Sequence, residues 1–106
     1  MRVLLDHGTP APLRRALPDH QVVTAYEKGW AGLTNGELLA AAEGAFDVLV
    51  TTDQNLRYQQ NLAGRQLAIL VLPSTSWPRL ALHTEEIAAA IVALRPGQLQ
   101  EWSFPA

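Results

Sequence analysis

Short apolar runs and amphipathic segments alternate along the chain, which is typical of strands and helices that follow one another. The apolar runs predict buried strands, at residues 2–6, 21–25, 47–52 and 66–72. The amphipathic segments predict helices, the first of them capped by Thr9, at residues 9–17, 34–46, 54–64 and 84–97. Residues 74–83 are expected to be irregular, and the polar–apolar alternation at 98–104 predicts an edge strand.

This order of elements predicts a single α/β domain over residues 1–106, with a mostly parallel sheet flanked by helices. Residues 3–5 and 48–50 are apolar at consecutive positions, so both faces of the sheet must be covered. No apolar run approaches the roughly 20 residues of a membrane span, so no membrane partner is expected.

Two of the predicted strands are followed by an aspartate. Asp6 ends the first apolar run, and Asp53 follows the third. Parallel strands place their C-terminal ends on one edge of a sheet, and ligands bind at that edge where the strand order reverses. Glu37 lies in the first turn of the helix predicted at 34–46 and is expected to point toward the same crevice.

Three carboxylates in one crevice would repel one another, by about 4 kcal/mol per pair at ~4 Å and an effective dielectric of ~20. Either one of them takes up a proton, or a hard cation lies between them. An all-oxygen site suits Mg²⁺ or Mn²⁺, which can activate water and stabilise charge on a phosphodiester. Each acid also has a structural alternative: Asp53 could cap the next helix, and Thr34 with Glu37 fits a capping box.

Charge and composition narrow the choice of partner. The net charge of −2 argues against a strongly basic duplex binder, because such proteins neutralise many phosphates at once. Arg14, Arg15 and Arg57 are the candidate phosphate contacts, since arginine binds phosphate in a bidentate manner. Trp77 is expected to be a core or interface residue, and stacking on a base is the weaker alternative. The absence of cysteine excludes disulfides and thiolate metal sites, and fits a cytoplasmic protein.

Three stretches carry a family resemblance: "RVLLDHGTPAPLRRAL", "TNGELLAAAEGAFDVLVTTDQNL" and "LAILVLPS". Over roughly residues 2–95 the chain resembles the small PIN-like proteins of the DUF5615 family, which are predicted nucleases of toxin–antitoxin type. The resemblance implies a PIN-like three-layer sandwich that cleaves single-stranded RNA with Mg²⁺ or Mn²⁺, and a small antitoxin as partner. It places the family's catalytic and metal-binding acids at Asp6, Glu37 and Asp53.

The chain departs from this family at two positions where relatives typically carry acids, Asn35 and Asn55. Asparagine can bind a metal through its carbonyl oxygen, but it supplies no charge, so both residues are possible additional ligands. The departures leave two hypotheses open, a metal-dependent ribonuclease and a weak or inactive binding module of the same fold.

A third hypothesis is a phosphorylation receiver domain, which also carries aspartates after its first and third strands. Such a domain usually has an acidic pair after the first strand and a lysine after the fifth. Here His7 follows Asp6, and Lys28 is the only lysine. A homodimer is also open, through an exposed Trp77 or through the edge strand predicted at 98–104.

Overall fold

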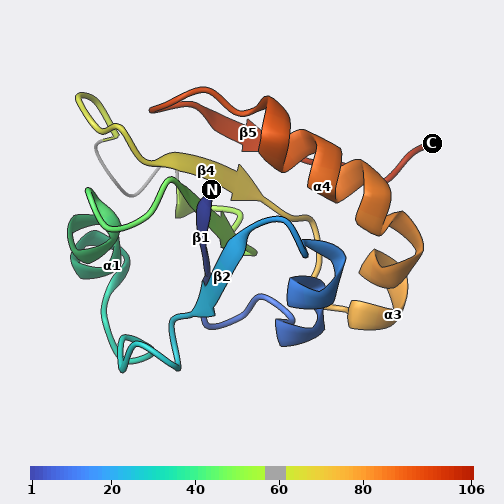
Figure 1. Cartoon of the computed structure of the whole chain (residues 1–106), viewed down its shortest axis with the longest axis horizontal. Helices are drawn as coiled ribbons and strands as arrows, with labels where there is room; N and C mark the ends of the chain where they lie inside the picture. Colours follow the sequence, from blue (N-terminus) through green and yellow to red (C-terminus); the bar gives the residue numbers. More distant parts are fainter. Residues whose placement is uncertain (57–61) are drawn as a thin grey trace.

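The computed structural model describes residues 1–56 and 62–106 and contains one five-stranded sheet in which every strand pair is parallel (Figure 1). In spatial order the strands are β2 (Gln21–Thr24), β1 (Arg2–Leu5), β3 (Val48–Thr51), β4 (Ala68–Val71) and β5 (Leu99–Glu101). The predicted α/β class is therefore confirmed, and β5 lies at the edge of the sheet, as expected.

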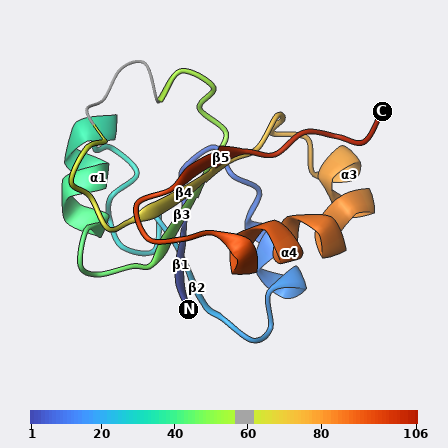
Figure 2. The same cartoon turned by 90° about the horizontal axis from the view of Figure 1, so that it is seen from above.

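Helices cover both faces of the sheet, which gives three layers (Figure 2). One face is covered by α1 (Asn35–Ala42). The other is covered by η1 (Ala11–Ala16), α3 (Trp77–Leu80), η2 (Ala81–His83) and α4 (Thr84–Ala93). None of the described helices is long and apolar enough to cross a bilayer.

The two faces have separate hydrophobic cores because successive strand residues point to opposite sides of a sheet. Leu5 and Leu70 pack with Ile87 of α4 in one core. Leu4 and Leu49 pack in the other, with residues of α1. These strand side chains are almost completely buried, which explains why the strands read as continuous apolar runs.

Two predicted elements differ from the structure. The first helix is a 3-10 helix that begins later than expected, with Pro10 rather than Thr9 as its N-cap. The Thr9 side chain is buried and turned toward β3, where its hydroxyl donates to the Val50 carbonyl at 2.9 Å, and the helix starts one residue later. Residues 77–83, expected to be irregular, form α3 and η2, because a proline is tolerated in the first helical turn and Leu80 is buried beneath it.

The helix predicted at 54–64 includes residues 57–61, which lie outside the described residues. At the end of α1, Gly44 has a φ of 82° and stops the helix, as the sequence predicts.

The strand order reverses between β1 and β3. From β1 the chain proceeds to β2 on one side, and from β3 it proceeds to β4 on the other. This 2-1-3-4-5 order is that of flavodoxin-like doubly wound sheets, whose ligands bind beyond the C-terminal ends of the strands at the reversal. Asp6 directly follows β1, and Asp53 lies just after β3, so both aspartates flank this position.

Candidate functional site

Asp6 is held at the C-terminal end of β1 by hydrogen bonds of its backbone and of both carboxylate oxygens. Its backbone N–H donates to the Val50 carbonyl at 2.9 Å, which continues the pairing of β1 with β3 by one residue. Its Oδ1 accepts from the backbone N–H of His7, and its Oδ2 accepts from the Thr51 hydroxyl, both at 2.7 Å. The carboxylate is therefore fixed beside the end of the neighbouring strand.

Thr51 joins the two aspartate-bearing segments through one atom. Its Oγ1 donates to Asp6 Oδ2 and accepts from the backbone N–H of Asp53 at 3.1 Å. The residue is 1% exposed, so this hydroxyl is satisfied by protein groups rather than by bulk water. The sequence analysis did not single out Thr51; the available signal was a threonine that closes an apolar run two residues before an aspartate.

Asp53 connects the loop after β3 to the start of α1. Its Oδ2 accepts from the side-chain Nδ2 of Asn35 at 2.6 Å. Its Oδ1 accepts from the backbone N–H of Asn55 at 2.9 Å, which is the local bond that the capping alternative expected. Asn35 therefore lies beside Asp53, whereas Asn55 contacts the aspartate through its backbone.

We call Asp6, Thr51, Asp53 and Asn35 the rim network. Apart from the buried Thr51, its members are half-buried, so they are held by the fold and remain accessible to solvent. Mg²⁺ keeps several waters and binds through one or two carboxylates, so Asp6 and Asp53 are the members of the network that could hold such an ion. An amide oxygen of Asn35 and the Thr51 hydroxyl are further neutral oxygens of the kind that hard cations accept.

Glu37 is engaged in the cap of α1. Its Oε1 accepts from the backbone N–H of Thr34 at 2.9 Å, and the Thr34 hydroxyl accepts from the backbone N–H of Glu37 at 3.3 Å. The capping box expected as the structural alternative is confirmed. The bond from the Thr34 backbone is the main reason that the pKa of Glu37 is lowered, with the Thr34 side chain second.

Across residues 1–56 and 62–106, no three acidic, histidine or cysteine side chains gather closely enough to hold a metal ion. Within the described residues, Thr51 links Asp6 to Asp53 by hydrogen bonds. The carboxylate of Glu37 is instead bonded to the backbone at the start of α1.

The candidate phosphate contacts Arg14 and Arg15 lie on η1. Arg14 forms an ion pair with the Glu27 carboxylate, which also accepts from the backbone N–H of Thr24 at 2.9 Å. The Thr24 backbone, followed by Arg14, lowers the pKa of Glu27. Arg15 is exposed. The third predicted contact, Arg57, lies outside the described residues.

Neighbouring loops support the rim network. Gln54 donates its side-chain amide to the carbonyls of Thr52 and Leu72, which ties the loop after β3 to the end of β4. Gly8, in the loop after β1, lies so close to Thr52 that a Cβ there would be 2.9 Å from the threonine Oγ1. The next nearest atom belongs to Thr75, at 4.0 Å from that Cβ. The loops after β1, β3 and β4 therefore meet at this edge.

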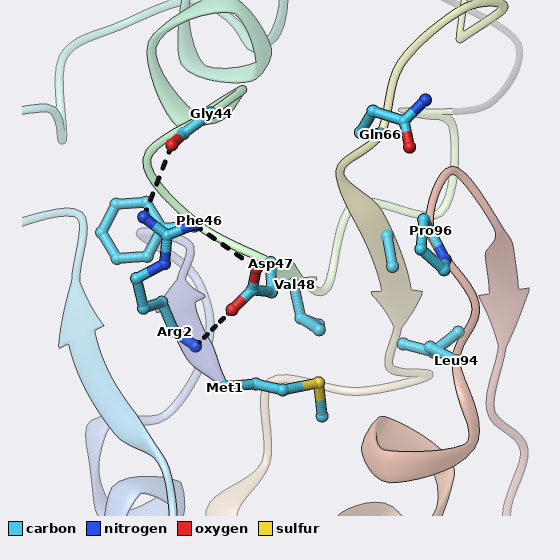
Figure 3. A pocket seen from close by; sticks show the side chains of 10 residues that line it. Met1, Arg2, Gly44, Phe46, Asp47, Val48, Gln66, Leu94 and Pro96 are labelled. Atoms are coloured by element: carbon cyan, nitrogen blue, oxygen red, sulfur yellow. Dashed lines mark hydrogen bonds and ion pairs between the residues drawn. The ribbon is translucent and has the colours of Figure 1, made fainter.

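A cavity of about 470 Å³ lies at the opposite edge, where β1 and β3 begin (Figure 3). The guanidinium of Arg2 reaches the Asp47 carboxylate and the Gly44 carbonyl, each at 3.4 Å. Asp47 also accepts from the backbone N–H of Arg2 at 2.8 Å, and this bond is the main cause of its lowered pKa. None of the site candidates that the structure describes lines this cavity.

No protein-family model, curated protein or solved structure matches this chain. The PIN-like resemblance therefore remains a prediction, which depends on the three stretches quoted above and on the positions of Asp6, Glu37 and Asp53.

Proposed function

We propose that this chain is a Mg²⁺- or Mn²⁺-dependent ribonuclease that cleaves single-stranded RNA. The observation that supports it is the link from Asp6 through the Thr51 hydroxyl to the Asp53 backbone, at the reversal of a parallel sheet. Two carboxylates from neighbouring strands, fixed at the edge where such sheets bind ligands, are a donor set suited to one hard cation.

Asp6 and Asp53 would hold the ion. When bound, such an ion activates water and stabilises charge that develops on a phosphodiester. Thr51 orients the Asp6 carboxylate and the backbone that carries Asp53, so it acts through both aspartates. Asn35 donates its amide N–H to Asp53; half a turn of that amide would present its oxygen instead.

Glu37 would bind the ion as a third acid or orient the attacking water. Its Oε1 is used in the helix cap, whereas its Oε2 accepts from no described group. A carboxylate with one fixed and one open oxygen can still accept a proton from water. Arg14, Arg15 and Arg57 would contact the RNA phosphates, and Asn55 would add an amide oxygen to the metal site. We place this activity in the cytoplasm, with which the absence of cysteine agrees.

Cleavage of a 5′-labelled single-stranded RNA in Mn²⁺ tests the proposal. The wild type should cut the RNA, and EDTA should stop the reaction. Asp6→Asn and Asp53→Asn should reduce cleavage to the level seen in EDTA, because each removes one charged ligand. Asp19→Asn, in an exposed loop before β2, is the matched control and should cleave as the wild type does. Equal activity in all four proteins would reveal a contaminating nuclease and overturn the proposal.

A non-catalytic binding module of the same fold is the second candidate. The bond from Asn35 to Asp53 favours it, since that amide offsets the carboxylate charge without a cation. Calorimetry with Mn²⁺ separates the two candidates: a ribonuclease should bind the ion with a dissociation constant of about 1 mM or lower, near −4 kcal/mol, and an inactive module should not.

A phosphorylation receiver is favoured by the strand order and by the position of Asp53 after β3. The chemistry around Asp53 argues against it. The neighbouring Asp6 is followed by His7 rather than by a second acid, and Lys28 lies over the ring of Trp30, 5.0 Å from its centroid. Labelling of Asp53 by acetyl phosphate would support this third candidate.

The resemblance extends the proposal to a toxin–antitoxin pair, in which a small protein covers the rim network. Growth arrest on expression of the wild type, but not of Asp6→Asn, would support the toxin role.

A homodimer through the outer edge of β5 is part of the same proposal, and sedimentation would test it. Trp77 suits a dimer contact less than expected, because it is half-buried rather than exposed.

A further inference from the structure

A groove follows η1 on the face of the molecule that carries α3 and α4. It consists of two cavities, of about 390 Å³ and about 280 Å³, which share Pro12 and Arg15 in their linings. The first cavity also contacts Arg14 and Glu27, and the second also contacts Trp77. We call the combined feature the η1 groove. We propose that it binds the part of a single-stranded RNA that extends away from the rim network, an inference that rests on the proposed ribonuclease function.

The residues at the centre of the groove match the two needs of single-strand binding, a stacking surface and a cation. Trp77 is half-buried and lines the second cavity, so part of its ring is accessible for stacking while the rest is held by the core. Arg15 lies where the cavities meet, is exposed, and forms no ion pair with any described residue. The charge of Arg14, by contrast, is already matched by Glu27.

The groove begins next to the rim network. The loop that follows Asp6 leads directly into η1. Gly8 in this loop lies near Thr75, and Trp77 follows two residues later at the start of α3. A strand whose phosphate lies at Asp6 therefore has a short path along the two loops to Trp77 and Arg15.

The lining favours nucleic acid over a peptide as the occupant. A bound amphipathic peptide would need a row of apolar pockets. Here Trp77 is the one large apolar side chain among the described lining residues, beside the small Ala16 and Ala81, while Thr24 and Glu27 line the other cavity. With one unpaired arginine and a net charge of −2, the groove should bind RNA mainly by stacking and with little salt dependence.

Fluorescence anisotropy of a labelled single-stranded RNA decamer, in EDTA to prevent cleavage, tests the groove. Trp77→Leu should weaken binding about five- to 150-fold, the effect of losing one stacked base. Trp77→Phe keeps a ring and should restore most of the affinity. Arg15→Gln should make the slope of log K against log salt less negative by about 0.7, the value for one phosphate on a single strand.

Two controls match these changes. Arg95→Gln removes an exposed arginine after α4, and Trp30→Leu removes a half-buried tryptophan that packs on Phe46 in the other core. Neither should change RNA affinity, and a thermal melt of each variant checks that it is folded.

Unchanged RNA affinity in Trp77→Leu, together with an unchanged salt slope in Arg15→Gln, would show that the η1 groove does not bind RNA. This holds even if the wild type cleaves RNA in Mn²⁺. Failure of the wild type to bind the decamer would also overturn this inference, and the cleavage assay would still decide the ribonuclease proposal. A third outcome is that Trp77→Leu and Arg15→Gln change RNA binding as expected while the wild type does not cleave RNA. That outcome would support RNA binding in the η1 groove and overturn the ribonuclease proposal.

Discussion

The side-chain amide of Asn35 donates to the carboxylate of Asp53 at 2.6 Å, so the first residue of α1 is bonded to the loop after β3. An aspartate at position 35 would place two carboxylates in contact. Without a cation, Asn35→Asp should lower the free energy of unfolding by about 1 to 4 kcal/mol, the limits for such a pair in water and at a protein surface. Urea denaturation in EDTA measures this loss.

Manganese should reverse that loss, because a hard cation relieves the repulsion and gains a charged ligand. We expect Mn²⁺ to raise the melting temperature of Asn35→Asp more than that of the wild type. Gln100→Glu is the matched control, since it adds a carboxylate at an exposed position of β5 that is not part of the rim network. If Mn²⁺ shifts the melting temperature of Asn35→Asp no more than that of the wild type, Asp53 does not belong to a metal site.

Replacement of Thr51 by serine should preserve stability and Mn²⁺ binding, whereas replacement by valine should reduce both. Valine has nearly the same shape but leaves Asp6 Oδ2 without its donor and the Asp53 backbone N–H without its acceptor. Loss of such a buried partner costs about 1–3 kcal/mol, whereas Thr51→Ser keeps the hydroxyl. Mn²⁺ calorimetry separates positioning from simple stability: Thr51→Val should bind the ion more weakly at a temperature where it is still fully folded. Equal binding by both variants would show that Thr51 does not position the aspartates.

Glu37 should make stability depend on pH in the acid range. Its pKa in the folded chain lies below the ordinary value of 4.5, mainly because the Thr34 backbone N–H binds the ionised carboxylate. Between the folded and unfolded values the folded state binds fewer protons. The stabilisation is therefore complete above the unfolded pKa and is lost as the pH falls through the folded one.

Glu37→Gln keeps the hydrogen bonds of a capping box but cannot titrate. Urea titrations from about pH 6 to about pH 3 should therefore show a smaller acid loss of stability in Glu37→Gln than in the wild type. Glu85→Gln, at the exposed start of α4, serves as the matched control for the loss of one surface carboxylate. Parallel profiles for the wild type and Glu37→Gln would contradict the role of the cap.

Gly97 cannot be replaced without displacing the backbone. It has a φ of 77°, and a Cβ there would lie 2.6 Å from the Arg65 carbonyl oxygen. Gly29 has nearly the same φ, 75°, with nothing within 4 Å of such a Cβ, so it isolates the conformational cost. Gly29→Ala should cost about 1–2 kcal/mol, and Gly97→Ala should cost more. Equal losses in urea denaturation would mean that the turn shifts to relieve the contact.

The sequence predicted the parallel sheet and the two aspartates at its edge because those features depend on local pattern and on general topology. Apolar runs on both faces require helices on both sides, and parallel strands share one C-terminal edge. The role of Thr51 was not predicted, since it depends on the register that pairs Leu5 with Val50 and so brings Thr51 level with Asp6.

The contact between Asn35 and Asp53 could not be predicted because it depends on how α1 packs on the sheet, which propensity does not specify. The first helix was misplaced for a similar reason. Thr9 is of a residue type typical of an N-cap, but its side chain is buried toward β3 and its hydroxyl donates to the Val50 carbonyl, a tertiary contact that local pattern does not specify.

The backbone N–H of Asp6 is bonded to the carbonyl of Val50, between two of the most deeply buried strands. Amide protons in such a position exchange with solvent only when the strands separate, which requires nearly the full free energy of unfolding. We therefore expect the backbone of Asp6, in the proposed metal site, to be among the last parts of the molecule to open. In the proposed ribonuclease, adaptation to different RNAs would therefore come from the surrounding loops rather than from this strand end.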